Sequence, residues 1–310
     1  MKVTDSSSYL GLHIERDRAK RVIWLSQPKY IVDVLERFNV RTGLTTFPAT
    51  PMNMDFNWKP TIDSPIEERG VLCEAKRKLY MQKIGSLVYL TIMTRPDILF
   101  ATNILSRFCK QPTQRHMEAV DRVLQFIAGT ADYKYTLHSG EGIVLYATTD
   151  ASYACHKDLK SHTGCTLHIG RHSASVHSVS KKQSITADSS TVAEFIAAHT
   201  CAKEIMWARN FLEELGFKQH NSTVLFEDNQ PAIKLMTNSN SGFKTKHIAL
   251  RYNFLREQIT KGLIDVRYLP SARMNADQLT KPFEPSKLAM SKALILGSIC
   301  SADREKNAKN

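Results

Sequence analysis

The stretch Thr-Val-Leu-Phe-Glu-Asp-Asn-Gln-Pro-Ala-Ile at residues 223–233 decides how the second half of the chain folds. Its first four residues are β-branched or apolar and indicate a short strand at 223–226. Residues 230–237 then indicate a helix, so only a short turn containing Asp228 separates the strand from the helix. Because helices that connect successive strands carry the chain back to a parallel neighbour, this stretch predicts the parallel part of an α/β sheet.

The residues on either side extend this unit to the order βββ-α-β-α-α-β-α. Upstream, three short runs indicate an antiparallel meander of consecutive strands, at 143–149, 165–170 and 173–179. A long helix follows, capped by Ser189 or Ser190 and ended by Gly216. Downstream we expect a helix at 247–261, a strand at 264–269 and a short helix at 275–280. The expected fold class is α/β, with a mixed five-stranded sheet and flanking helices.

The first part of the chain has a different pattern. A β-hairpin is expected at 9–25, and a polar, Pro-containing linker is expected at 53–78. Helical patterns occupy 28–38, 81–93, 96–109 and 113–128. We therefore expect a smaller α+β, largely helical part before the α/β sheet.

Length and composition exclude several classes of protein. The 310 residues suit about two ordinary domains, and 42% hydrophobic with 23% charged residues is not a disordered composition. No apolar run approaches the roughly 20 residues of a membrane span, and Met1 to Ser8 lacks the pattern of a secretory signal. The six cysteines contain no C-x-x-C pair, which favours free thiols over a disulfide framework. We expect no membrane partner and no disulfide.

The charge of the chain points to a polyanionic partner. The net charge is +12, and residues 1–140 hold 20 basic against 14 acidic residues, which is half of the excess. A basic excess spread over both halves is not a charged tail. It is the balance expected of a protein that binds nucleic acid, although many basic proteins bind nothing acidic.

Four acidic residues fall where functional sites gather on the predicted map. Asp150 ends the first strand of the meander, Glu194 lies one turn into the long helix, Asp228 ends the fourth strand and Asp277 opens the last helix. The carboxyl ends of neighbouring strands form the crevice in which α/β sheets bind ligands. Clustered carboxylates repel one another, and a divalent cation removes this repulsion. Oxygen ligands favour Mg²⁺ or Mn²⁺, and two such ions can bracket a phosphate.

The sequence resembles the Pol polyprotein of copia-type LTR retrotransposons, specifically its C-terminal part with the ribonuclease H domain. The resemblance covers roughly residues 9–283. It is carried by Tyr-Leu-Gly-Leu-His-Ile-Glu at 9–15, Gly-Ser-Leu-Val-Tyr-Leu at 85–90, Thr-Arg-Pro-Asp-Ile at 94–98, Leu-Ser-Arg-Phe at 105–108, Ser-Lys-Lys-Gln at 180–183, Glu-Asp-Asn-Gln-Pro-Ala-Ile at 227–233, Thr-Lys-His-Ile at 245–248 and Asn-Ala-Asp-Gln-Leu-Thr-Lys at 275–281.

The resemblance implies a division of the chain into four parts. Residues 1–52 would be the thumb-like C-terminal end of reverse transcriptase, and residues 53–139 a linker and helical connection. Residues 140–283 would be a ribonuclease H-like domain and residues 284–310 a C-terminal tail. The expected fold is therefore ribonuclease H-like, preceded by a smaller remnant of reverse transcriptase.

The implied activity is that of a hydrolase, a metal-dependent endoribonuclease that cuts the RNA strand of RNA-DNA hybrids. Asp150, Glu194, Asp228 and Asp277 match the D-E-D-D set of catalytic metal ligands for two Mg²⁺ or Mn²⁺ ions. No two aspartates are adjacent in the chain, so we expect no polymerase activity. The alternative is a catalytically inactive remnant that binds nucleic acid. A DNA-strand transferase of the related integrase fold is disfavoured, because that family has its acids in the order Asp, Asp, Glu.

The expected partners are the RNA-DNA hybrid and the remaining reverse transcriptase portion of the polyprotein. The expected location is a cytoplasmic virus-like particle or the nucleus. Lys181 and Lys182 precede the helix that carries Glu194, and we expect them to contact backbone phosphates. Three further candidates are Lys244, Lys246 and His247, which lie at a helix start that could hold a phosphate, although a capping role for His247 is equally open. Arg251 matches a helix position of the same domain and completes the expected nucleic-acid-binding set.

Two further expectations concern residues outside these sets. Glu227 precedes Asp228 on a strand and should point to the opposite face, so it is left out of the metal site. The Cys/His-rich stretch at 155–177 favours surface residues of the meander over a zinc site, because alternating strand residues do not converge. Its His162 stands where the family usually has a small polar residue.

Overall fold

The computed structural model describes residues 7–54, 70–138, 142–170, 173–238 and 246–297. It divides the chain into two compact units, one formed by residues 1–137 and 282–310 and the other by residues 138–281. Each unit has a hydrophobic core of its own. None of the helices in the described ranges is long and apolar enough to cross a membrane.

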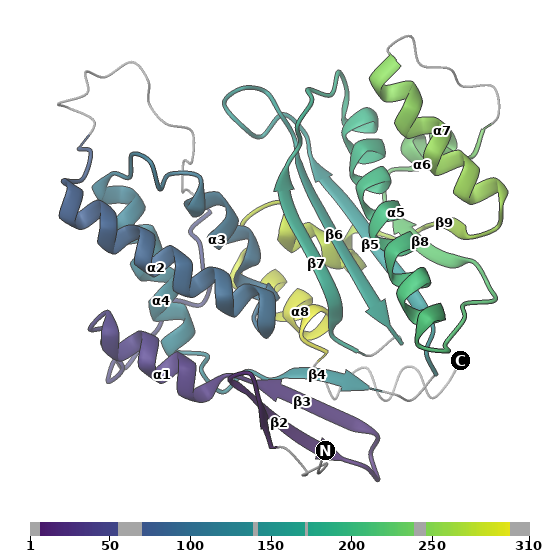
Figure 1. The fold of residues 1–310 in the computed structure, drawn as a ribbon. Helices are drawn as coiled ribbons and strands as arrows, with labels where there is room; N and C mark the ends of the chain where they lie inside the picture. The colour runs from purple at the N-terminus through teal and green to yellow at the C-terminus, as the bar shows by residue number, and fades with distance from the viewer. Residues whose placement is uncertain (1–6, 55–69, 139–141, 171–172, 239–245, 298–310) are drawn as a thin grey trace. The chain divides into compact units, whose positions relative to one another are not determined.

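The first unit combines a four-stranded sheet of order β1-β2-β3-β4 with a group of helices (Figure 1). Its elements are β1 (Ser8–Tyr9), β2 (Leu12–Asp17), β3 (Val22–Ser26), α1 (Pro28–Arg37), α2 (Glu74–Met93), η1 (Pro96–Ile98), α3 (Leu99–Ser106), α4 (Gln114–Ala128), β4 (Tyr135–His138) and α8 (Pro285–Ile295). Fully buried apolar side chains such as Val34, Leu87, Ile104 and Leu124 come from four different helices and form the core.

The Thr-Arg-Pro-Asp motif at 94–97 stabilises this first unit. Arg95 is almost completely buried, and its guanidinium donates two hydrogen bonds to the Asp97 carboxylate, at 2.9 and 2.8 Å. It also donates to the hydroxyl and the carbonyl oxygen of Thr130, so each of its three guanidinium nitrogens donates at least one hydrogen bond. Burying a charged side chain costs much free energy unless the charge is paired and hydrogen-bonded in this way. This motif of the resemblance is therefore structural.

The second unit is built around a five-stranded mixed sheet of order β7-β6-β5-β8-β9 (Figure 1). Its elements are β5 (Leu145–Ser152), β6 (His162–Ile169), β7 (Ser175–Lys182), α5 (Ser190–Glu214), β8 (Thr223–Glu227), α6 (Gln230–Thr237), α7 (Lys246–Thr260), β9 (Ile264–Tyr268), η2 (Ser271–Arg273) and η3 (Asn275–Leu279). Strands β5 to β7 are antiparallel neighbours, whereas β5, β8 and β9 run parallel.

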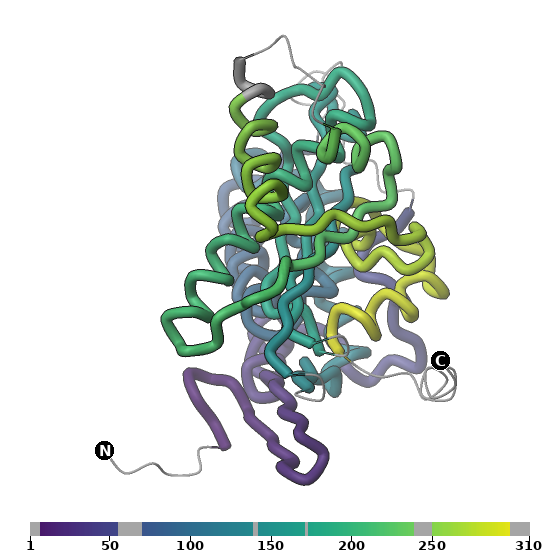
Figure 2. Tube along the Cα trace, turned by 90° about the vertical axis from the view of Figure 1, so that its right-hand side faces the viewer, coloured from purple at the N-terminus to yellow at the C-terminus, as the bar shows by residue number. Residues whose placement is uncertain are grey.

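The core of the second unit lies between the sheet and helix α5. Helix α5 runs along one face of the sheet and packs against α6 and α7 (Figure 1; Figure 2). Phe195 and Ile205 of α5 meet Leu225 of β8 and Leu255 of α7, and all four side chains are fully buried. The short η3 packs against β5 and β6, so this helix also belongs to the unit.

The predicted fold class is confirmed. The sheet is mixed and five-stranded with flanking helices, as expected for a ribonuclease H-like α/β fold, and a smaller α+β part precedes it. Several boundaries were wrong. Strand β5 continues to Ser152, so Asp150 lies inside the strand and does not end it. Helix α2 begins at Glu74, within the predicted linker, and the predicted tail contains helix α8.

Candidate functional site

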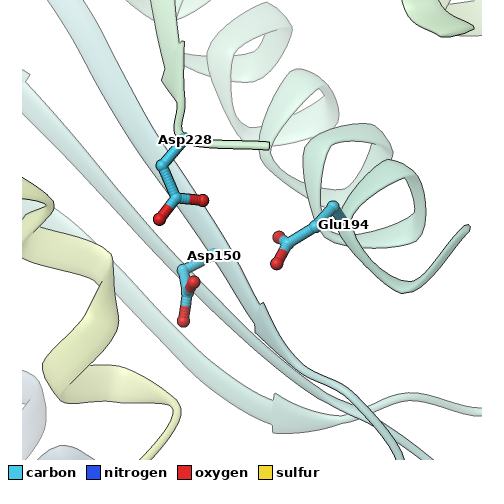
Figure 3. Close-up of side chains that lie close together, drawn as sticks. All are labelled: Asp150, Glu194 and Asp228. Atoms are coloured by element: carbon cyan, nitrogen blue, oxygen red, sulfur yellow. The ribbon is translucent and has the colours of Figure 1, made fainter. Parts of the chain in front are cut away.

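Three of the four predicted carboxylates meet at one point of the second unit. Asp150 comes from β5, Glu194 from α5, and Asp228 directly follows β8. Each offers one carboxylate oxygen, and these three oxygens all lie within 4.8 Å of one another. Figure 3 shows the three carboxylates facing a common space. Asp150 and Glu194 are buried, while Asp228 is half-buried and opens the cluster to solvent.

Strand register and two helix caps set this arrangement. Residues 146–148 of β5 pair in parallel with residues 224–226 of β8, so Asp150 and Asp228 leave the paired region at the same end. Ser189 begins α5 by accepting the backbone N–H of Val192, which places Glu194 in the first turns. Asn229 begins α6 in the same way by accepting the N–H of Ala232 at 2.9 Å, which fixes the turn that holds Asp228.

Asp277 lies next to this cluster but is not one of the three. It sits in η3, its side chain is 2% exposed, and its Oδ2 forms an ion pair with the Lys281 ammonium at 3.2 Å. The neighbouring Thr280 hydroxyl donates a hydrogen bond to Asp150 Oδ2 at 2.5 Å. The predicted fourth ligand is therefore held beside Asp150, with a lysine as its cationic partner.

The backbone of η3 lies very close to the backbone of strand β6 at Gly164. Gly164 of β6 is the cross-strand partner of Asp150, and a Cβ at Gly164 would lie 2.5 Å from the carbonyl oxygen of Ala276. It would also lie 2.7 Å from the Thr280 methyl group. Only glycine leaves room for η3 at this distance. This glycine therefore allows Thr280 to reach Asp150.

A buried chain of hydrogen bonds supports the same segment. The Ser180 hydroxyl donates to the carbonyl oxygen of Leu279 at 2.7 Å, so its oxygen accepts from Nε2 of His162 at 2.9 Å. Nδ1 of His162 then accepts from Nε2 of His156 at 3.0 Å. His162, the departure from the usual family pattern, thus links β6 to the end of η3.

Burial and mutual repulsion dominate the electrostatics of the cluster. Burial raises the pKa of Asp150 to about 7, and the charge of Asp277 adds to the rise against the opposing charge of Lys281. Burial also raises the pKa of Glu194 to about 11, with smaller contributions from Glu227 and Asp150. Carboxylates in such surroundings are stabilised in their charged form by a cation placed among them.

Glu227 borders this cluster but is not one of the three residues that form the metal-ligating group, so leaving it out of the metal site stays a prediction. It is fully buried, and its Oε1 accepts the backbone N–H of Asn229 at 3.0 Å. Burial is the main cause that raises its pKa well above the usual value. Glu227 lies on the same face of β8 as Leu225, which belongs to the core that contains residues of α5, the element that carries Glu194.

The predicted nucleic-acid-binding residues are only partly gathered. Lys181 and Lys182 are the last two residues of β7, and Lys182 forms an ion pair with Asp158. The charges of Arg251, Lys203 and Lys181 act on His199, whose pKa falls to about 4, mainly through burial. Lys203, which acts on His199 together with Lys181 and Arg251, was not among the predicted residues. Lys244 lies outside the described residues, as do the side chains of Lys246 and His247.

The expectation that the Cys/His-rich stretch lies at the surface was wrong for four of its six described members. His156, His162, Cys165 and His168 are buried. Both ring nitrogens of His162 and of His168 have hydrogen-bond partners, and only the acidic triad forms a metal-ligating group within the described residues. The stretch therefore packs and positions the sheet.

Comparison with known proteins decides the family. No protein-family model matches the chain. It is 36% identical over 289 residues to the retrovirus-related Pol polyprotein from transposon TNT 1-94 of Nicotiana tabacum, an alignment that covers 92% of this chain and 21% of that protein. It is 35% identical over 274 residues to the corresponding polyprotein from transposon RE1 of Arabidopsis thaliana, which covers 87% of this chain and 18% of that protein. The chain belongs to the Pol polyproteins of copia-type transposons.

The resemblance found in the sequence is thereby confirmed. The chain spans about a fifth of the length of the Pol polyproteins that it matches. Among solved structures, a ribonuclease H1 isolated from compost by a metagenomic approach aligns with 44% of this Pol chain and 92% of its own length, at 13% identity and a TM-score of 0.34.

Proposed function

We propose that the second unit is a metal-dependent endoribonuclease that cuts the RNA strand of RNA-DNA hybrids. The observation that carries the proposal is the meeting of Asp150, Glu194 and Asp228, from three separate elements, with their ligand oxygens within 4.8 Å. Membership of the Pol polyprotein family supports the same reading. The assignment of these residues as catalytic groups is part of the proposal.

The donor set fits divalent magnesium or manganese. All the groups are carboxylates, and Glu194 Oε2 is buried without a hydrogen-bond partner among the described residues. An unpaired buried carboxylate oxygen is costly unless a cation contacts it. Asp150, Glu194 and Asp228 would hold the metal, with Asp277 as the fourth ligand of a two-ion centre. When bound, the ions supply Lewis acidity at the water and at the leaving oxygen of the phosphodiester.

The chain's own residues orient the ligands and hold the substrate. Thr280 fixes one oxygen of Asp150, and Ser271 donates to Oδ2 of Asp228 at 2.5 Å, so both carboxylates have a set orientation. Lys181 and Arg251, with Lys203, would contact phosphates of the hybrid backbone. Lys182, Lys244, Lys246 and His247 stay predictions for the same role. Such contacts read backbone and shape and carry little base information.

The test is a cleavage assay with the whole purified chain. Three labelled substrates are compared, an RNA-DNA hybrid, a duplex DNA and a single-stranded RNA, each with Mg²⁺, with Mn²⁺ and with a chelator. The proposal expects hybrid cleavage that confines its cuts to the RNA strand and disappears with the chelator. Binding of the hybrid without cleavage in either metal would instead establish the inactive remnant. Strand joining on duplex DNA would establish the transferase.

Replacing Asp228 by Asn is the sharpest single test of the ligand assignment. The amide oxygen can still accept from Ser271, but the charge that binds a cation is lost. Losing one ligand of a two-metal site costs several kcal/mol of transition-state stabilisation, which is on the order of 10³-fold in rate. Thermal stability without metal should stay equal or rise, because repulsion with Asp150 is relieved.

The matched control is Asp265→Asn. Asp265 lies on β9 of the same unit, is partly exposed, and pairs with Arg267 at 2.7 Å. Its replacement should leave the rate within about twofold of the parent. A variant at Asp228 that cleaves within about threefold of the parent at equal Mg²⁺, roughly 0.65 kcal/mol, would reject the assignment.

A further inference from the structure

Lys281 is the cation that the structure itself places among the candidate ligands. Its Nζ lies 3.2 Å from Asp277 Oδ2, and its side chain is 43% exposed, whereas that of Asp277 is 2% exposed. The residue directly before it, Thr280, is fixed to Asp150 by a 2.5 Å hydrogen bond. The backbone therefore holds the base of the lysine beside the cluster, while the end of its side chain still reaches solvent.

The electrostatic surroundings of Lys281 come from the same acids. Burial lowers the pKa of Lys281, but the charges of Asp150 and Asp277 outweigh this effect and raise it. The ordinary pKa of a lysine is about 10.4, so the ammonium that pairs with Asp277 carries a positive charge at neutral pH.

We propose that Lys281 serves as a built-in counter-ion that is displaced by metal and then contacts the substrate phosphate. In the metal-free protein the ammonium neutralises Asp277 and part of the charge of Asp150. A divalent ion held by these carboxylates repels the ammonium. Because the Lys281 side chain is 43% exposed, its end can move from the carboxylates towards solvent. The substrate phosphate approaches from that side, and a long flexible lysine stem allows the exchange of partners. The phosphate contact rests on the proposed nuclease function, whereas the counter-ion role does not.

This arrangement predicts opposite effects on metal binding and on cleavage. Removing the ammonium takes away a competitor of the metal, so the metal should bind more tightly. Removing it also takes away a phosphate contact, so cleavage at saturating metal should slow. A lysine that merely stabilised the fold would weaken both together.

The experiment uses the whole chain with Lys281→Met, which keeps an unbranched stem without the charge, and Lys281→Arg, which keeps the charge. Lys261→Met is the matched control, because Lys261 is an exposed lysine of α7 paired with Glu257 at 2.6 Å. Mg²⁺ and Mn²⁺ affinity is measured by calorimetry without nucleic acid, and hybrid cleavage is measured at saturating Mg²⁺. Circular dichroism verifies folding, and Lys281→Gln replaces the Met variant if that one fails to fold.

Lys281→Met should bind the metal about tenfold more tightly, the effect of removing one unit charge a few ångströms from a divalent ion. Its cleavage rate should fall about tenfold, while Lys281→Arg keeps the metal affinity of the parent and Lys261→Met keeps both parent values. Unchanged or weaker metal binding in Lys281→Met overturns the counter-ion. Tighter metal binding with unchanged cleavage overturns the phosphate contact. Tighter metal binding in a chain whose parent cuts no hybrid supports the counter-ion and rejects the nuclease.

Discussion

His168 of β6 is a fully buried histidine whose protonation state follows from its neighbours. Its Nδ1 lies 3.1 Å from the carbonyl oxygen of Ser173, which can only accept, so Nδ1 carries the proton. Its Nε2 lies 2.9 Å from the Thr166 hydroxyl and therefore accepts. The ring also stacks on Tyr146, with the ring centroids 4.7 Å apart. Every contact of this ring fits the neutral form.

Acid should therefore destabilise the second unit through His168. Burial lowers its pKa to about 4, below the ordinary value of about 6.5 in the unfolded chain. The neutral ring contributes stability that is complete above pH 6.5 and is lost as the pH falls towards 4. Between pH 7 and pH 5 the loss should be about 2 kcal/mol.

The measurement is denaturant unfolding of the parent and of His168→Gln at both pH values. Because Gln does not titrate, the variant should lose about 2 kcal/mol less than the parent on acidification. The imidazole resonance of His168 should not shift between pH 7 and pH 5. A resonance that titrates near pH 6.5 would contradict the argument.

At the scale of single residues, sequence predicted the acids through their positions on strands and at a helix start. Asp150, Glu194 and Asp228 lie together for this reason. The sequence did not show that Glu227 is buried beside these acids, because burial depends on what packs on its strand. No role was predicted for Lys281, because nothing in the sequence distinguishes this lysine from a surface lysine. Its role depends on how closely η3 approaches β6.

That approach of η3 to β6 is the contact between elements on which the site depends most. Gly164→Ala would place a methyl group 2.5 Å from the Ala276 carbonyl oxygen, which is backbone and cannot move aside alone. We expect a loss of about 1–3 kcal/mol of stability from this overpacking. Because η3 carries Thr280, metal affinity should fall as well, as calorimetry with Mn²⁺ would show.

Gly85→Ala is the control for this substitution. Gly85 lies inside helix α2, and nothing lies within 4 Å of a Cβ at that position. Alanine is the better helix former, so stability should rise by about 0.5–1 kcal/mol without any change in metal binding. Equal effects of the two substitutions would show that the Gly164 contact is unimportant.

At the scale of elements, periodicity found almost every strand and helix but misplaced those without a clear apolar period. Helix α2 begins with Glu-Ala-Lys-Arg-Lys at 74–78, which is polar and mostly exposed, so nothing distinguishes it from a linker. Strand β4 is only four residues long. Helix α8 has few buried residues, and one of them, Leu288, packs in the core formed by helices far away in the sequence. Only tertiary contacts define such elements.

The first unit is built from two separate segments of the chain, which a division into consecutive domains cannot represent. The chain leaves the first unit at Leu137 and returns to it at Pro282. Phe283 and Leu288 then join the core that α1 to α4 build. The assigned roles of the ranges 1–52, 53–139, 140–283 and 284–310 stay predictions. The buried side chains of Phe283 and Leu288 therefore complete the core of the first unit from a segment distant in the sequence.

Ending the chain after Lys281 should therefore weaken the first unit and leave the second unit intact. The truncation removes Phe283, Leu288, Ile295 and Leu296, which are all buried. At about 1.5–3 kcal/mol for each buried side chain, the loss is several kcal/mol. Hydrogen exchange should accelerate in α2 to α4, whereas amides of β5 and β6 should keep their protection.

A pair of point variants separates packing from truncation. Leu288→Ala removes a side chain that is 6% exposed and should cost about 2–5 kcal/mol, whereas Met290→Ala on the same helix removes one that is 68% exposed and should cost little. Exchange in α2 to α4 should rise with the first variant and not with the second. Protection lost in β5 and β6 instead would mean that α8 stabilises the second unit. The assignment of residues from 282 onward to the first unit would then be wrong. A segment slows hydrogen exchange mainly in the unit whose hydrophobic core it helps to form.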